Sequence, residues 1–129
     1  PKVAIVVPCY KEPDDIIAKT ISACLRQVYP SSRLHVFLLD DNQNQPVRDA
    51  RKACMLEAYK ECFELGGGRW LPEAKRPGFS VVWRPDNSHA KAGNMNHWLQ
   101  SNDHGFDWEF FVLFDCDMVP HPLFVQEML

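Results

Sequence analysis

Two carboxylates one residue apart, Asp115 and Asp117, are the most conspicuous candidates for chemistry in this sequence. They follow an apolar run at residues 110–114 that is typical of a buried strand. Because residues i and i+2 of an extended chain point to the same side, we expect both carboxylates to project together. Neighbouring carboxylates repel unless a cation lies between them, and magnesium is commonly held by one or two carboxylates with substrate phosphates and water. The alternative is a solvated acidic loop, because an Asp-x-Asp pair alone is a weak signal.

Two further strands end in residues that suit ligand binding. Asp40 and Asp41 follow an apolar run at residues 35–39, and Tyr10 follows another at residues 3–8. The tyrosine ring offers a flat surface on which a nucleobase stacks; packing at the sheet edge is its alternative role. The two aspartates also have a plain alternative, because Asp and Asn often form turns by bonding to their own backbone.

Lys91 lies near the start of a predicted helix at residues 89–99, where the helix macrodipole disfavours a cation. A bound phosphate would resolve this conflict, because the lysine and the helix amides would hold it together. The alternative is a solvated lysine, which is the usual state of a single lysine. For His89 the sequence leaves two possibilities open, an anion contact and an exposed loop histidine.

The elements that position these residues alternate along the chain. Strands are expected at residues 3–8, 35–39, 79–83 and 110–114, and helices at 14–28, 47–65 and 89–99, with a closing helix from Pro122 and a polar connection over 101–107. The glycines at 66–68 are expected to end the second helix. Helical spacing predicts three buried faces: Ile16, Ile17, Thr20, Ile21, Cys24, Leu25 and Val28; Val47, Ala50, Cys54, Ala58 and Cys62; and Met95, Trp98 and Leu99.

Strands that alternate with helices predict an α/β fold, a mostly parallel sheet with helices on both faces. Right-handed crossovers favour the spatial order third, second, first, fourth. Ligands bind open sheets of this kind where the strand order reverses, here between the first and fourth strands. Tyr10, Asp41, Lys91 and the Asp115–Asp117 pair would then converge, a set that suits a nucleoside diphosphate and a metal.

Composition excludes several classes of protein. The 129 residues are enough for one domain, and 46% hydrophobic with 24% charged residues is an ordinary globular balance. A net charge of −3 gives no support for nucleic-acid binding. The five cysteines show no zinc spacing and fit buried, reduced thiols. No run is apolar enough to span a bilayer and no signal peptide is present, yet the chain looks cut from something longer.

Four motifs in order carry a specific resemblance: P-x-Y-x-E at residues 8–12, Asp40-Asp41, H-A-K-A-G-N-M-N at 89–96 and D-C-D-M-V-P at 115–120. Together they resemble the family-two inverting glycosyltransferases, and most of all the cellulose synthase group of processive polysaccharide synthases. The resemblance covers nearly the whole chain, and its most diagnostic part is H-A-K-A-G-N.

The resemblance implies the nucleotide-binding half of a GT-A fold, a UDP-sugar donor (UDP-glucose most of all), a polysaccharide acceptor and Mg²⁺ or Mn²⁺. Tyr10 would stack on uracil, Asp41 would contact its polar edge, and Lys91 would meet the diphosphate. Asp115 and Asp117 would bind the metal. The full set implied for the nucleotide-sugar is Tyr10, Glu12, Asp41, Lys91 and Asp115.

The family places its general base in a T-E-D motif and an acceptor-binding Q-x-x-R-W motif further on, and neither occurs before Leu129. The resemblance therefore implies that residues 1–129 are the donor-binding part of a membrane-embedded synthase, on the cytoplasmic side. Three alternatives remain open: a non-processive transferase acting on a lipid or protein, a nucleotidyltransferase, and a non-catalytic UDP-binding module. The nucleotidyltransferase lacks support because residues 8–13 hold no glycine-rich phosphate loop.

Overall fold

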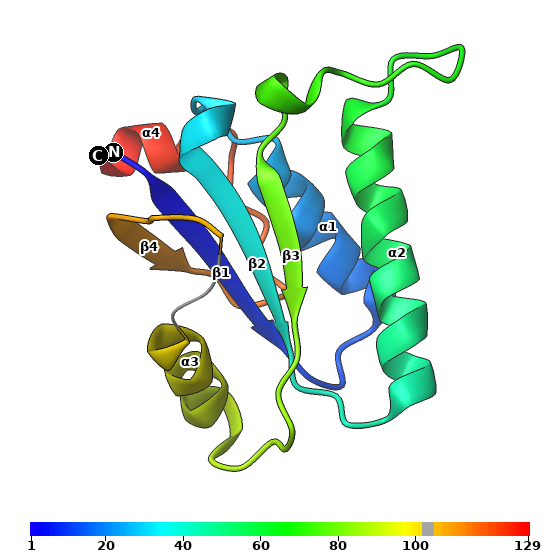
Figure 1. Ribbon diagram of the computed structural model, residues 1–129, viewed down its shortest axis with the longest axis vertical. Coiled ribbons are helices and arrows are strands. Elements are labelled where there is room, and N and C mark those ends of the chain that lie inside the picture. Colours follow the sequence, from blue (N-terminus) through cyan, green and yellow to red (C-terminus); the bar gives the residue numbers. More distant parts are fainter. Residues whose placement is uncertain (102–104) are drawn as a thin grey trace.

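A four-stranded parallel sheet forms the centre of the computed structural model, which describes residues 1–101 and 105–129 (Figure 1). Its strands are β1 (Val3–Cys9), β2 (Leu34–Asp40), β3 (Gly78–Val82) and β4 (Phe110–Leu113). Their spatial order is β3-β2-β1-β4, and each neighbouring pair is parallel. Both the α/β class and the strand order expected from the sequence are therefore confirmed.

Helices cover both faces of this sheet. They are α1 (Asp14–Leu25), α2 (Gln45–Phe63), α3 (Ala90–Gln100) and α4 (Phe124–Met128), with short 3₁₀ turns at Ser31–Arg33 and Glu73–Lys75. Figure 1 shows α1 and α2 on one side of the strands and α3 on the other. All seven residues of β1 are buried, as expected of a central strand covered on both faces. Among the helices described, none combines the length and apolar character needed to cross a bilayer.

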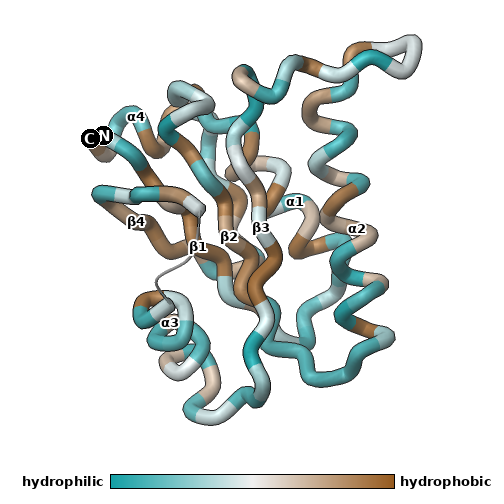
Figure 2. The backbone as a smooth tube through the Cα atoms, viewed as in Figure 1, coloured by the Kyte–Doolittle hydropathy of each residue, from teal (hydrophilic) through white to brown (hydrophobic). Residues whose placement is uncertain are grey.

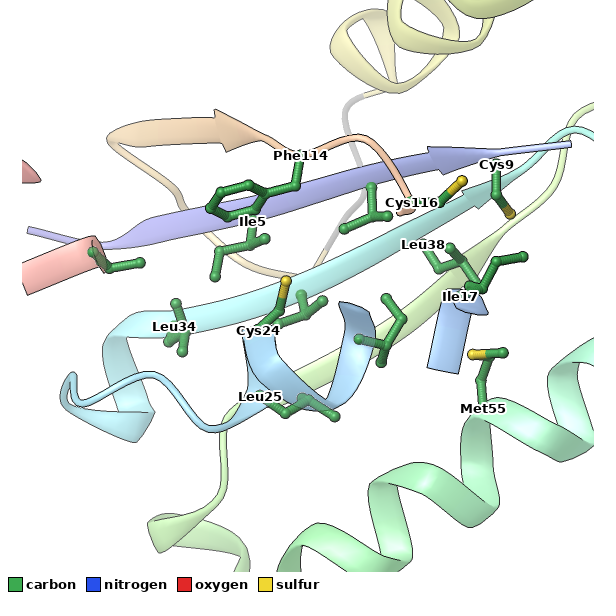
Figure 3. Packing of buried hydrophobic residues seen from close by; sticks show 14 of the residues in the cluster. Ile5, Cys9, Ile17, Cys24, Leu25, Leu34, Leu38, Met55, Phe114 and Cys116 are labelled. Carbon is green, nitrogen blue, oxygen red and sulfur yellow. The ribbon is translucent and has the colours of Figure 1, made fainter. Parts of the chain in front are cut away.

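Alternate residues of β1 contribute to two hydrophobic clusters. Val3, Ile5 and Val7 pack with α1 and with Met55 of α2 in the larger cluster, seen close up in Figure 3. Ala4 and Val6 pack with Phe37 and Trp98 in the smaller cluster under α3. Figure 2 shows hydrophobic residues concentrated along the strands and many hydrophilic residues in the helices and connecting segments.

The register brings the carboxyl ends of β1 and β2 level with each other. Cys9 is paired with Asp40, and the backbone N–H of Asp41 donates to the carbonyl of Cys9 at 2.9 Å. Tyr10 and Asp41 therefore leave the sheet side by side. On the other side of β1, Leu113 pairs with Val6, so the chain beyond β4 runs along the last residues of β1.

Some expected helix faces differ from the structure. In α1, Ile16 is exposed, and Val28 is exposed because the helix ends at Leu25. In α2 the buried residues are Arg51, Met55 and Ala58, whereas Val47 and Ala50 are exposed. The prediction for α2 is confirmed at Ala58, and Cys54 and Cys62 are partly buried against the larger cluster. It was wrong for Val47 and Ala50, and it missed Arg51 because it counted only apolar residues.

Leu99 of α3 is also exposed, so the inner face of this helix is Asn94 and Trp98 with partly buried Met95. The helix α2 ends at Phe63 with Glu64 as its C-cap, so the three glycines at 66–68 do not end it as expected. They all have positive φ and lie in the turn between Glu64 and Trp70, which pair as an antiparallel bridge. The polar connection expected over residues 101–107 lies partly outside the described residues, at 102–104.

The strand β4 is less buried than its apolar sequence predicts. Phe110, Phe111 and Leu113 are each about half exposed, and only Val112 is packed against the larger cluster. The reason is position, because β4 lies at the edge of the sheet and pairs only with β1 in the described part of the chain. Its apolar composition gave no information about an edge location.

Candidate functional site

A cavity of about 340 Å³ opens at the carboxyl end of the sheet, and every site residue predicted from the sequence lines it. They come from the ends of three strands and the start of α3: Tyr10, Glu12, Asp41, Lys91, Asp115 and Asp117. The remaining lining residues are Pro8, Cys9, Asn87, Ala90, Asn94 and Cys116. The structure thus brings together predicted site residues that are up to 107 positions apart along the chain, from Tyr10 to Asp117.

The loop after β1 presents Tyr10 and Glu12. Tyr10 is 38% exposed, and its hydroxyl accepts a hydrogen bond from Asn87 Nδ2 at 3.0 Å. The Tyr10 backbone N–H donates to Glu12 Oε1 at 2.6 Å, which closes the loop into a tight turn. Burial alone would raise the pKa of Glu12, but the backbone N–H groups of Tyr10 and Glu12 lower it overall. The loop therefore offers an accessible ring beside an ionised carboxylate.

Asp41 forms a buried ion pair with Arg84, a residue that the sequence reasoning missed. Arg84 Nε donates to Asp41 Oδ1 at 2.6 Å and Nη2 donates to Oδ2 at 2.8 Å. The hydrogen bond to Asp41 raises the pKa of Arg84 above its ordinary value. Arg84 also donates to the carbonyls of Ser88 and Ala90, at 2.8 and 3.0 Å. The arginine therefore connects the acidic turn after β2 with the segment that precedes Lys91.

The segment at residues 89–94 has an unusual backbone conformation and packs closely against the end of β2. His89 and Ala90 adopt positive φ values of 59° and 48°, a conformation rare for residues with a side chain. A Cβ atom on Gly93 would overlap the carbonyl oxygen of Ser88 and would lie 2.8 Å from Arg84 Nη1. Asn94 is buried and donates from Nδ2 to the carbonyl of Leu39 at 2.9 Å. Gly93 and Asn94 thus fix the start of α3 against the end of β2.

Lys91 lies at the start of α3 and faces the cavity, where Nζ forms an ion pair with Asp115 Oδ1. Both side chains are about half exposed, so such a pair contributes little to stability. Lys91 is thus a cation within reach of the carboxylate turn. His89, for which two roles were open, is exposed and does not contribute to the cavity lining.

Asp115 and Asp117 lie in a turn rather than in extended strand. The strand β4 ends at Leu113, and the backbone N–H of Met118 donates to the Asp115 carbonyl at 2.9 Å. The same-side argument from strand geometry was therefore wrong for this pair, although both carboxylates do line the cavity. Buried Cys116 anchors the turn, because its carbonyl accepts a hydrogen bond from Thr20 Oγ1 of α1 at 2.6 Å.

The donor set suits a hard divalent cation that shares its ligands with a substrate. Two exposed carboxylates, Asp115 and Asp117, face one cavity. Within the described part of the chain no cluster of three or more His, Cys, Asp or Glu side chains is placed to hold a metal. Magnesium needs only one or two carboxylates when phosphate and water oxygens complete its shell. The residues present therefore fit a metal that binds together with a diphosphate.

The two cysteines of the cavity are not suited to nucleophilic chemistry. Burial raises the pKa of the Cys9 thiol, and burial with the nearby Glu12 raises that of Cys116 to about 12. Both thiols are free, in agreement with the expectation of buried, reduced cysteines. Cys54 and Cys62 depart from that expectation, because they are only partly buried.

Sequence comparison identifies relatives over the whole chain. The chain is 31% identical over 129 residues to "Putative cellulose synthase 2" of Komagataeibacter xylinus. The identity is also 31% over 129 residues with "Cellulose synthase catalytic subunit (UDP-forming)" of Pseudomonas fluorescens SBW25. Both alignments cover 100% of this chain but only 7% and 14% of those proteins.

Solved structures share the fold. One is S. aureus TarS 1-349 in complex with UDP, with a TM-score of 0.65 and 17% identity over 99% of this chain and 31% of that one. Another is the mannosyltransferase PcManGT of Pyrobaculum calidifontis in complex with GDP-Man and Mn²⁺, with a TM-score of 0.63 and 20% identity over 91% of this chain and 28% of that one. These likenesses agree with the GT-A fold implied by the sequence motifs.

The family model described as "Glycosyl transferase family 2" matches residues 4–129, which include all six predicted site residues. The chain therefore belongs to glycosyl transferase family 2.

Proposed function

We propose that this chain is the donor-binding part of a UDP-sugar-dependent glycosyltransferase that extends a β-glycan resembling cellulose. The observation that carries the proposal is the convergence of an aromatic ring, a lysine and separate carboxylates on one cavity at the carboxyl end of the sheet. A nucleoside diphosphate needs a stacking surface, an anion partner and a metal site, and the cavity offers a candidate for each.

The base would bind on the side of Tyr10 and Asp41. The exposed Tyr10 ring offers the stacking surface, and the Asp41 carboxylate can accept the N3–H of uracil. Arg84 already bonds both oxygens of Asp41, but each carboxylate oxygen has a second lone pair. Glu12 also lines the cavity, and its carboxylate accepts a hydrogen bond from the Tyr10 backbone N–H.

The diphosphate and a metal would bind on the opposite side. Lys91 would turn from Asp115 to the phosphates, and Asp115 and Asp117 would hold Mg²⁺ or Mn²⁺. A divalent metal in such a site supplies charge neutralisation for the leaving diphosphate. Lys91 would add a positive charge to the same group, and the first amides of α3 would contribute their partial charge.

Inverting transfer also needs a carboxylate that deprotonates the attacking acceptor hydroxyl. We propose that this general base lies beyond Leu129, as the family resemblance implies, and that residues 1–129 supply the donor side of the reaction. The acceptor would be the growing polysaccharide. We further propose that segments outside this chain place it at the cytoplasmic side of a membrane.

An assay of the membrane-bound protein that contains this chain tests the proposal. Labelled UDP-glucose with Mg²⁺ or Mn²⁺ is expected to give a long polymer, sized after digestion with linkage-specific glucanases. A single labelled sugar on a lipid or a protein would instead support the non-processive alternative. Absence of transfer from every UDP-sugar tried, together with absence of UDP binding, would contradict the proposal.

A further inference from the structure

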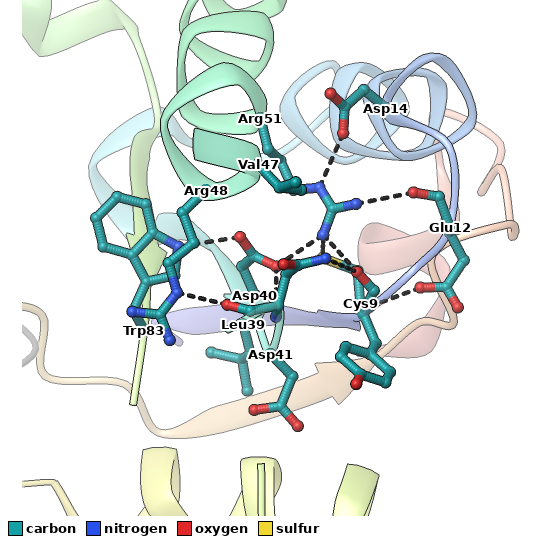
Figure 4. A network of polar contacts seen from close by, with 12 residues as sticks. Cys9, Glu12, Asp14, Leu39, Asp40, Asp41, Val47, Arg48, Arg51 and Trp83 are labelled. Atoms are coloured by element: carbon teal, nitrogen blue, oxygen red, sulfur yellow. Dashed lines mark hydrogen bonds and ion pairs between the residues drawn. The ribbon is translucent and has the colours of Figure 1, made fainter. Parts of the chain in front are cut away.

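Arg51 of α2 is a buried arginine that the proposed function does not use. Its side chain lies behind the loop that carries Tyr10 and Glu12, and the residue is only 2% exposed. Figure 4 shows its guanidinium between Asp14 and the Cys9–Glu12 region, with Asp40 beside it. An arginine so deeply buried at the border of a ligand cavity needs a reason, because burying a charge is costly unless it is fully paired.

Every nitrogen of the Arg51 guanidinium is engaged. Nε donates to Asp14 Oδ1 at 2.8 Å, and Nη1 donates to Asp40 Oδ1 at 2.7 Å. Nη1 also donates to the carbonyl of Tyr10 at 2.7 Å, and Nη2 donates to the carbonyl of Glu12 at 2.8 Å. These acceptors belong to the start of α1, the end of β2 and the loop after β1. One side chain of α2 therefore ties all three segments together.

Asp40 is in turn fixed by other donors. The residue is completely buried, and its carboxylate accepts Trp83 Nε1 at 3.0 Å and the Asn42 backbone N–H at 3.1 Å. Asp40 therefore holds the Arg51 guanidinium in place, and the guanidinium in turn holds the carbonyls of Tyr10 and Glu12 by hydrogen bonds. The Tyr10 and Glu12 carbonyls belong to the loop after β1, which carries the ring assigned to the base, whereas Lys91 belongs to α3 and Asp117 to the turn after β4.

We propose that Arg51 is a positioning residue for the nucleoside half of the donor, a role that rests on the proposed function. Arg51 holds the carbonyls of Tyr10 and Glu12 by hydrogen bonds. The Tyr10 ring and the Glu12 carboxylate therefore keep a single conformation in the cavity before the ligand binds. A lysine cannot replace it, because its compact ammonium lacks the planar fork that reaches separate acceptors. The phosphate side of the cavity is built on α3 and the turn after β4, and in the described part of the chain Arg51 donates no hydrogen bond to either segment.

The test compares two half-ligands, uridine and pyrophosphate with Mg²⁺, in purified protein by competition against UDP. In Arg51→Lys, which keeps the charge next to Asp40, we expect uridine to bind at least about tenfold more weakly, comparable to the loss of a stacked base. Pyrophosphate affinity is expected to stay within about twofold, because its contacts lie elsewhere in the cavity. A ratio that shifts in this way is not produced by a general loss of stability.

Met55→Ala is the matched control. Met55 is fully buried on the same face of α2, one turn beyond Arg51, and packs in the larger cluster. Its truncation should lower the melting temperature and leave the uridine-to-pyrophosphate ratio unchanged. If Met55→Ala reproduces the selective loss, or if Arg51→Lys weakens both ligands equally or neither, the positioning role is overturned.

Asp14→Asn provides a milder test if Arg51→Lys fails to fold. It removes the charge that holds Nε but leaves the bonds from Nη1 and Nη2, so an intermediate selective loss of uridine affinity is expected. An unchanged ratio in a folded Asp14→Asn protein would overturn the inference. If the wild-type protein binds neither UDP nor uridine, the proposed function itself fails. Normal wild-type binding with an unselective Arg51→Lys variant refutes the positioning role alone.

Discussion

The guanidinium of Arg84 meets the carboxylate of Asp41 at two points, with Nε 2.6 Å from Oδ1 and Nη2 2.8 Å from Oδ2. The same guanidinium holds the carbonyls of Ser88 and Ala90, directly before Lys91. Arg84 therefore connects the acidic turn, which is proposed to contact the base, with the start of α3, which is proposed to bind phosphate. A substitution of Arg84 should therefore affect the binding of both the base and the phosphates.

Removing Arg84 is expected to be severely destabilising. In Arg84→Met, the Asp41 carboxylate stays buried without its cation, which typically costs about 3–5 kcal/mol. Urea unfolding followed by circular dichroism measures the loss. The double variant Asp41→Asn with Arg84→Met should lose less than the sum of the two single variants, because it leaves no unpaired charge. A loss below about 1 kcal/mol in Arg84→Met would show that Asp41 does not depend on this partner.

Gly93→Ala should disturb the start of α3. The added Cβ would overlap the Ser88 carbonyl and crowd Arg84 Nη1, so the loop before Lys91 has to shift. Overpacking of this kind costs about 1–3 kcal/mol, and thermal unfolding measures it. Ala92→Ser is the control, because it adds one heavy atom at an exposed neighbouring position. Equal melting temperatures for both variants would contradict the close approach at Gly93.

Tyr10 offers a graded test of base stacking. Tyr10→Ala is expected to weaken UDP binding by about 1–3 kcal/mol while pyrophosphate binding changes little, because only the base loses its platform. Tyr10→Phe keeps the ring and removes only the hydroxyl that accepts from Asn87, so it should retain most of the UDP affinity. Calorimetry on both variants measures the difference. Equal losses of UDP and pyrophosphate in Tyr10→Ala would make the ring merely structural.

The positions of the site residues were predictable because they follow from topology. Strands that alternate with helices require a parallel sheet, and right-handed crossovers set its order, so residues after each strand gather at one edge. The strand order alone was enough to predict that Tyr10, Asp41 and Asp115 lie at the same edge of the sheet. The family motifs added the roles expected for each residue, and those roles remain predictions.

The two buried arginines were not predictable in the same way. Arg51 lies on a helix whose apolar residues indicate a different face, and Arg84 sits in what the sequence shows as a plain turn. Their partners Asp40 and Asp41 are 11 and 43 residues away along the chain, a relationship that no periodicity reports. Polar networks of this kind depend on the final packing and become visible only in the structure.

The exposure of β4 shows a similar limit. Its apolar run predicts a buried strand, but burial depends on which neighbours a strand has, and β4 has only β1 in the described part of the chain. The strand end was predicted to within one residue, but Asp115 and Asp117 were expected on one side of an extended chain and instead follow β4 in a turn. Both carboxylates reach the cavity through turn geometry instead.

The metal assignment concerns Asp115 and Asp117. In Asp117→Asn the carboxylate becomes an amide of the same shape at an exposed position, so the fold should be unaffected. The metal dependence of UDP binding should disappear, because magnesium strongly prefers charged oxygen ligands. Circular dichroism and the melting temperature provide the control for folding.

The most direct test of the whole account is a calorimetric titration of UDP into the wild-type protein with and without Mg²⁺, repeated with Asp117→Asn. The account predicts binding of one UDP that is at least about tenfold tighter with Mg²⁺ in the wild type, and the same weak binding with or without Mg²⁺ in the variant. No UDP binding by the folded wild-type protein, or a full metal dependence that survives in Asp117→Asn, would contradict it.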